Sequence, residues 1–235
     1  MLWKIDYSFR LCSSLQWTSS SLNAVLENKI KSTVKPILKK GRGGDWEHTL
    51  RTLEYARHLL EHEEGEEKIV IPTLYLHDIG WSKVDFTDFV NAPPAEKRGA
   101  TSVSLHMKYG AQLAERILYE LDFEPEPRTK ITSIIAIHDE PEKVFAMGDP
   151  SATLVVEADY FDRYGSESYL RFLHMFGSTF LDGDHRREAI EYLRQGLDIW
   201  FKTQTARYLA EKLARERGLF CREGEMSRLL DIERS

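Results

Sequence analysis

Four side chains of types that commonly bind divalent metals stand where a helical protein would bury them: His48, the adjacent His77 and Asp78, and Asp159. The His77–Asp78 pair follows the nearly apolar run 69–76. Burying an imidazole and a carboxylate together is costly unless something charged compensates for both. A divalent cation does so, because imidazole nitrogen and carboxylate oxygen both suit Mn, Fe, Co, Ni and Zn. We therefore predict that these side chains bind one or two divalent metal ions.

Two further histidines share this setting. His106 begins a pattern of apolar residues at helical spacing, and His138 ends the apolar run 131–137. Taken singly, each histidine is more often a core or surface residue than a ligand. Four histidines and two aspartates on helix faces are hard to explain without metal. Asp139 and Asp162 adjoin the proposed ligands, and they are the alternatives if the helical register is off by one turn.

The remaining histidines are predicted to lie outside the site. His58 and His62 fall in a polar stretch, and His185 falls at a helix start, so all three are expected at the surface. His174 lies in an aromatic segment and is expected in the core.

Apolar residues recur at three- to four-residue spacing along most of the chain, which is typical of helices. Short β-branched clusters occur, but each continues into a helical pattern. We expect helices over 21–39, 46–63, 69–78, 101–120, 127–138, 150–164, 166–181, 185–200 and 203–217. The sequence therefore predicts an all-α protein.

Turn-forming residues mark the boundaries of the helices that carry the candidate ligands. Gly41-Arg-Gly-Gly44 breaks the chain, and Asp45 after it can cap the next helix. Gly80 suits the C-terminal cap of the helix that holds the His-Asp pair. Segment 82–100 is expected to be irregular, either as a lid over a substrate pocket or as an ordinary packed loop.

Composition limits the classes of function. The 235 residues carry a net charge of −6, so no overall positive field exists to hold a nucleic acid polymer or an anionic membrane. The longest apolar run is too short to cross a bilayer, and the first ten residues lack the apolar stretch of a signal peptide. Two cysteines 209 positions apart favour a reducing compartment, and we expect a cytoplasmic protein. Aromatic residues in 166–235 are expected in the core, or alternatively in a homodimer interface.

The order of the candidate ligands carries a family resemblance. The strings are His48-Thr-Leu-Arg51, Leu74-Tyr-Leu-His77-Asp78-Ile-Gly80, His106-Met-Lys-Tyr-Gly110-Ala111, Ile134-Ile-Ala-Ile-His138 and Glu157-Ala-Asp159. In this order, H…HD…H…H…D, the chain resembles the HD-domain superfamily over about residues 45–165. The resemblance implies an all-α HD-domain bundle as the metal-binding core. Residues 1–44 would then be an N-terminal helical extension, and 166–235 would be C-terminal helices packed on that core.

The resemblance also implies roles for the six residues. His48, His77, Asp78 and Asp159 match the positions that hold the first metal. His106 and His138 match the positions that hold a second metal with Asp78 bridging the pair, although both could instead bind a phosphate oxygen beside a single ion.

The expected chemistry is hydrolysis of a nucleotide or other small phosphate ester by a metal-activated water, with Mn, Fe, Co, Ni, Mg or Zn as the metal. No GxSxG motif occurs that would supply a nucleophile instead. Asp78, Arg51 and Lys83 are the candidate catalytic residues, the two basic ones as phosphate contacts. Lys83 could equally have a plain surface role, and Arg51 could equally pair with a nearby carboxylate such as Glu47 or Glu54. The alternatives are a di-iron oxygenase of the myo-inositol oxygenase kind and a non-catalytic metal-binding sensor.

Overall fold

The computed structural model of the chain describes residues 22–165 and 183–216, apart from the side chains of 94, 95 and 183–189. Helices make up most of these ranges. They are α1 (Ala24–Leu38), α2 (Asp45–Leu60), α3 (Glu67–Leu76), η1 (Ile79–Lys83), α4 (Thr87–Asn91), η2 (Pro94–Gly99), α5 (Thr101–Glu120), α6 (Pro125–Ile135), α7 (Pro141–Ala146), α8 (Pro150–Phe161), α10 (Gly183–Trp200) and α11 (Gln204–Glu216). Because the described residues contain no strand, the all-α prediction is confirmed.

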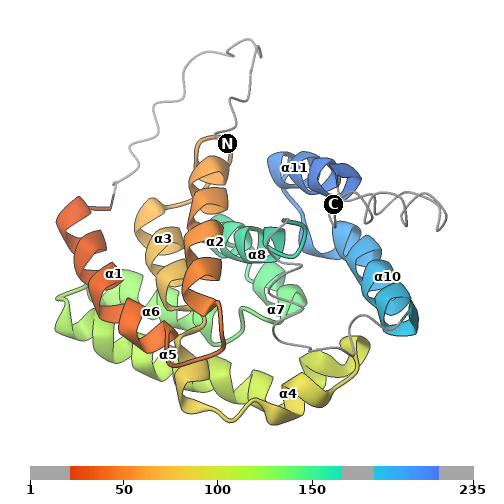
Figure 1. The fold of residues 1–235 in the computed structure, drawn as a ribbon. Coiled ribbons are helices and arrows are strands. Elements are labelled where there is room, and N and C mark those ends of the chain that lie inside the picture. The colour runs from red at the N-terminus through yellow and green to blue at the C-terminus, as the bar shows by residue number, and fades with distance from the viewer. Residues whose placement is uncertain (1–21, 166–182, 217–235) are drawn as a thin grey trace, which may run out of the picture.

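The central helix is α3, which is buried from Ile69 to its last residue, Leu76. It contacts α1, α2, α6 and α8, and Figure 1 shows α1, α3 and α2 side by side with α8 next to α2. A helix that is apolar on every side is stable only when other helices surround it. The ends of α3 and of its neighbours therefore have fixed positions in the interior.

The last two described helices lie on the far side of α8 from α1 (Figure 1). Trp200 and Phe201, which join α10 to α11, belong to the same hydrophobic core as α3 and α8. On α11 the buried residues Ala206, Ala210 and Ala214 recur every fourth position, so one narrow face of this helix packs inward. None of the described helices is long and apolar enough to cross a membrane.

Several boundaries differ from the expected ones. Gly44, with φ of 85°, is the N-cap of α2, so the prediction that Asp45 caps this helix is wrong. Asp45 is instead the first helical residue, and its carboxylate accepts the backbone N–H of Arg42 at 2.8 Å. Segment 82–100 is not irregular throughout, because η1, α4 and η2 fall within or overlap it. The helix expected over 166–181 lies outside the described residues.

Candidate metal centre

The six candidate ligands come together where helices end. His48 is in the first turn of α2, His77 follows α3, Asp78 precedes η1, His106 lies in α5, His138 follows α6, and Asp159 lies in the last turn of α8. All six side chains are buried. The C-terminal ends of α3, α6 and α8 carry partial negative charge, so their macrodipoles favour a cation at the point where these ligands meet.

One half of the cluster is formed by His48, His77, Asp78 and Asp159. The Nε2 atom of His48 lies 3.2 Å from Nε2 of His77 and 2.9 Å from Oδ1 of Asp159. Oδ2 of Asp78 lies 3.5 Å from Nε2 of His77 and 3.7 Å from Nε2 of His48. Two donors bound to one ion at about 2.1 Å and roughly at right angles would be about 3 Å apart. These separations therefore suit ligands of one ion.

The other half is formed by His106, His138 and the second oxygen of Asp78. The Nε2 atoms of the two histidines lie 3.3 Å apart. Oδ1 of Asp78 lies 3.8 Å from Nε2 of His106 and 3.9 Å from Nε2 of His138. Each oxygen of one carboxylate thus faces a different pair of imidazole nitrogens. This is the arrangement expected of a carboxylate that bridges two ions.

The hydrogen bonds of the imidazole rings test whether this cluster fits a cation. Nδ1 of His77 donates to the carbonyl of Leu74, and Nδ1 of His138 donates to the carbonyl of Ile135, both at 2.8 Å. Nδ1 of His48 donates to Oδ2 of Asp162 at 2.7 Å. Since each of these partners can only accept, Nε2 of a neutral ring carries a lone pair. When both rings are neutral, Nε2 of His48 and Nε2 of His77 face each other as two lone pairs, and a cation between them removes the repulsion.

The ionisation of the buried groups also suits metal binding. Burial lowers the pKa of His77, and it lowers the pKa of His106 to about 3, so both rings are neutral at pH 7. Burial opposes protonation of His138 as well, but the adjacent carboxylates of Asp78 and Asp139 raise its pKa to about 9. A metal ion that binds His138 must therefore displace a proton, so binding to this half of the cluster strengthens as the pH rises toward 9.

A buried arginine contacts the carboxylate shared by the two halves. Arg42 donates from Nη2 to Oδ2 of Asp78 at 2.6 Å and from Nε to Oδ1 of Asp45 at 3.1 Å. Although burial raises the pKa of the Asp78 carboxyl, the charge of Arg42 holds it well below its usual range. The indole of Trp81 donates to Oδ1 of Asp78 at 3.0 Å and stacks on the ring of His106, with the ring centroids 4.0 Å apart. Asp78 is thereby fixed in orientation and kept ionised.

Close packing of backbone brings η1 against α5. A Cβ atom at Gly80 would lie 1.9 Å from the carbonyl oxygen of His106 and 2.6 Å from the backbone nitrogen of Gly110. Gly80 lies inside η1, and the C-cap of α3 is His77, so the prediction that Gly80 caps this helix is wrong. Glycine is needed at position 80 because the backbones of η1 and α5 touch. That contact places Asp78 beside His106.

Asp162 and Arg51 position His48. Asp162 accepts from Nδ1 of His48, and Arg51 donates to Oδ1 of Asp162 at 2.5 Å and to Oδ2 at 2.9 Å. A carboxylate on the second nitrogen of a ligating histidine fixes its tautomer and raises its basicity. The structure thus pairs Arg51 with Asp162, whereas the sequence suggested a neighbouring carboxylate such as Glu47 or Glu54. The direct contact of Arg51 with phosphate stays a prediction.

Replacing Asp162 by asparagine should weaken metal binding roughly 10- to 100-fold, because the negative charge behind His48 is lost. Isothermal titration with Mn²⁺ would measure the change. Asp149→Asn is the matched control, since Asp149 caps the N-terminus of the same helix and its side chain accepts from Ala152. Equal affinity in the two variants would show that Asp162 does not act through His48.

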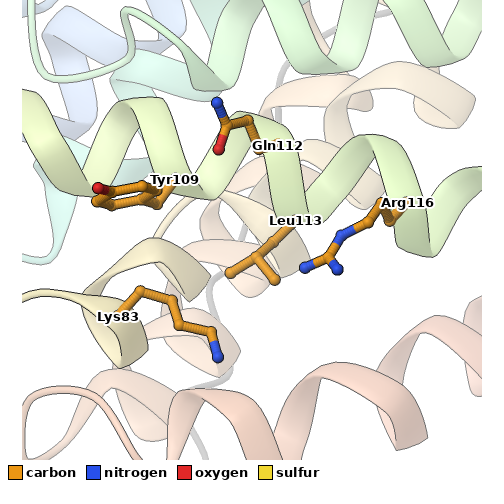
Figure 2. A pocket seen from close by; sticks show the side chains of 5 residues that line it. All are labelled: Lys83, Tyr109, Gln112, Leu113 and Arg116. Atoms are coloured by element: carbon orange, nitrogen blue, oxygen red, sulfur yellow. The ribbon is translucent and has the colours of Figure 1, made fainter.

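Lys83 lies in a surface depression of about 540 Å³. Its other lining residues are Tyr109, Gln112, Leu113 and Arg116, and none of the six candidate ligands is among them. Figure 2 shows the side chains of Lys83 and Arg116 on either side of Leu113. The structure thus places Lys83, from η1, near Arg116, an exposed cation on α5. The phosphate contact expected of Lys83 stays a prediction.

Two of the other histidines, His58 and His62, do not join the cluster. His62 is exposed and His58 is half-buried at the end of α2, where their rings lie 4.9 Å apart. His174 lies outside the described residues, and the side chain of His185 is also outside them.

Sequence reasoning did not find two arginines at this site, the buried Arg42 and the half-buried Arg163. Arg42 sits in the glycine-rich break before α2, and Arg163 sits four positions after Asp159. An i, i+4 spacing places Arg163 on the same helical face as a predicted ligand, which was an available signal. The position of Arg42 depends on its contact with Asp78, 36 positions away, and the sequence around Arg42 carries no comparable signal.

Comparison with known proteins gives one family. The model of a family described as the HD domain matches residues 45–164, which is about half of the chain. No curated protein and no solved structure matches the chain.

Proposed function

Because the chain belongs to the HD-domain family, we propose that it is a metal-dependent phosphohydrolase acting on a nucleotide or another small phosphate ester. The observation that carries the proposal is the carboxylate of Asp78, whose two oxygens face two different pairs of imidazole nitrogens. A site of this kind can hold two divalent ions, and a pair of cations suits the charge that develops on a phosphoryl group.

Bound divalent ions would lower the pKa of a coordinated water and polarise the phosphoryl oxygen. The described residues would orient the ligands, keep them in the right ionisation state and accept a proton. Asp162 keeps the Nε2 lone pair of His48 directed into the site, and Arg42 and Trp81 keep Asp78 ionised and oriented. The carboxylate of Asp139 lies 3.4 Å from Nε2 of His106. We assign Asp139 as the acceptor of the proton from the attacking water.

The expected substrate is small. A net charge of −6 gives no long-range attraction for a nucleic acid polymer, so we propose binding of a compact phosphate ester at a local cluster of cations. A homodimer and a cytoplasmic location also remain proposals.

The test is metal analysis of protein purified without chelator, followed by phosphate release from a panel of nucleotides and phosphate monoesters. We expect Mn, Fe, Co, Ni, Mg or Zn in the protein and metal-dependent release of phosphate. Electron paramagnetic resonance under air and under reductant separates the main alternative. A mixed-valent iron pair without phosphate release would identify an oxygenase and overturn the proposal. Bound metal with neither reaction would indicate a sensor.

A further inference from the structure

Two arginines beside the candidate metal centre share one aromatic surface. Arg163, directly after α8, lies with its guanidinium carbon 3.6 Å from the ring centroid of Tyr160 and 5.4 Å from that of Trp200. Arg98, from η2, lies 5.1 Å and 5.5 Å from the same two centroids. Arg98 also donates to the hydroxyl of Tyr160. Two cations from different parts of the chain therefore converge on one pair of rings.

Within residues 22–165 and 190–216, Arg163 has no close acceptor for its guanidinium hydrogens. Its Nη1 lies 3.9 Å from Oδ2 of Asp159, and its Nη2 lies 3.9 Å from Oδ1 of Asp139, and both separations are too long for hydrogen bonds. Nη1 is buried and has no hydrogen-bond partner among the described residues. Leaving a buried donor unsatisfied costs about 1–3 kcal/mol, and more for a charged group. This donor is thus available to a ligand.

Of the two carboxylates near Arg163, Asp159 belongs to one half of the metal centre and Asp139 adjoins the other. The other oxygen of Asp159 lies 2.9 Å from Nε2 of His48, and the other oxygen of Asp139 lies 3.4 Å from Nε2 of His106. Arg163 is therefore placed at the border of both halves. A phosphoryl group held at the metal centre would lie within reach of its guanidinium.

Arg98 has no carboxylate within ion-pair distance among the described residues, and its hydrogen-bond partner is the hydroxyl of Tyr160. Burial raises the pKa of Tyr160 well above its ordinary value, so this hydroxyl is neutral. Contact with the rings offsets part of the charge of each guanidinium. Two guanidinium groups at the same rings still repel each other unless an anion joins them.

We propose that Arg163 and Arg98 bind two neighbouring anionic groups of one ligand. Arg163 binds the phosphoryl group at the metal centre, and Arg98 binds a second phosphate of the same molecule. The ligand class is a small molecule with two phosphates a few bonds apart, such as a diphosphate or a bisphosphate. That this ligand is the substrate rests on the proposed function. Binding of the ligand does not require hydrolysis.

The rival anion site is the depression of Figure 2, which also presents two cations, Lys83 and Arg116. Both are exposed side chains, and exposed cations bind anions weakly because water and salt screen them. Arg116→Ala is therefore the matched control for the substitutions of Arg98 and Arg163, and Lys83→Ala tests the rival site directly.

The experiment measures binding of methylenediphosphonate, which cannot be hydrolysed, and of inorganic phosphate by titration calorimetry of the full chain as purified. Metal content is determined before and after each titration. Arg98→Ala should weaken methylenediphosphonate binding about tenfold and change phosphate binding less than about twofold. Arg163→Ala should weaken both about tenfold. Arg98→Lys should recover part of the loss, because it restores the charge without the planar donor fork.

Arg116→Ala should leave both affinities unchanged. Equal weakening in all four alanine variants would mean binding by net charge alone and would overturn the proposal. Weakening only in the Lys83 and Arg116 variants would move the site to the depression and overturn it as well. Unchanged near-ultraviolet circular dichroism in Arg98→Lys excludes misfolding as the cause of a loss.

The two proposals fail in different ways. Diphosphonate binding that depends on Arg98 and Arg163, without hydrolysis of any phosphate ester, would contradict the phosphohydrolase and leave the anion site intact. Hydrolysis of phosphate esters, together with diphosphonate binding that neither arginine substitution weakens, would contradict the anion site and leave the phosphohydrolase intact.

Discussion

Replacing Asp78 by asparagine should abolish metal binding at the proposed site, leaving roughly 0.2 ions per chain or fewer after gel filtration, because a neutral amide is a much poorer metal ligand than an ionised carboxylate. Each oxygen of Asp78 faces one pair of imidazole nitrogens, so a single substitution affects both halves of the cluster. Elemental analysis by mass spectrometry measures the loss. Phosphate release should fall at least about a hundredfold with it.

Asp45→Asn is the matched control for this substitution. Asp45 and Asp78 both pair with Arg42, at 3.1 Å and 2.6 Å, but Asp45 is not a candidate ligand. Both variants should lose stability, by roughly 1–3 kcal/mol, because the buried guanidinium loses one charged partner. Only Asp78→Asn should lose metal. His77→Ala should also lose metal while the helical circular dichroism largely survives. Full metal content in Asp78→Asn or in His77→Ala would show that the site is wrongly placed.

Gly80→Ala should destabilise the protein by roughly 3 kcal/mol or more, because the added Cβ overlaps backbone rather than a movable side chain. The new atom would lie 1.9 Å from the carbonyl oxygen of His106, so relief requires η1 to move away from α5. That movement also separates Asp78 from His106, and metal binding should weaken together with stability. Urea unfolding followed by circular dichroism measures the first effect.

Gly99→Ala is the control for the glycine substitution. A Cβ at Gly99 would have nothing within 4 Å, so its effect should stay within about 0.5 kcal/mol. If Gly80→Ala unfolded at the same urea concentration as Gly99→Ala, the close contact between η1 and α5 would be refuted.

The sequence was sufficient to predict the fold class and the family. Helical periodicity predicted most of the helices near their observed places, and the order of histidines and aspartates predicted membership of the HD-domain family; both predictions are confirmed. These features were readable because each depends on spacing within a single helix or on the order of a few residues. The structure brings the six predicted residues together in one buried cluster, and their binding of metal stays a prediction.

The remaining features of the site depend on contacts between distant parts of the chain. Gly80 looked like a helix cap from its neighbours, but the contact with α5 explains it. The aromatic residues before and within 82–100 allowed a lid or a packed loop. Trp81 is 1% exposed and packs with Val103 and Met107, which favours the packed loop. Arg98 and Arg163 become neighbours only because η2 and α8 meet at the same rings.

The ligands come from segments far apart along the chain, and this has a thermodynamic consequence. His48 and Asp159 are 111 positions apart (159 − 48), and their side chains meet at 2.9 Å. An ion held by both would act as a reversible cross-link, restricting the unfolded chain much as a disulfide does across a loop of that length. Unlike a disulfide, this link forms and breaks with the concentration of free metal. The free energy of unfolding would then rise and fall with the concentration of free metal around the protein, even where no substrate is present.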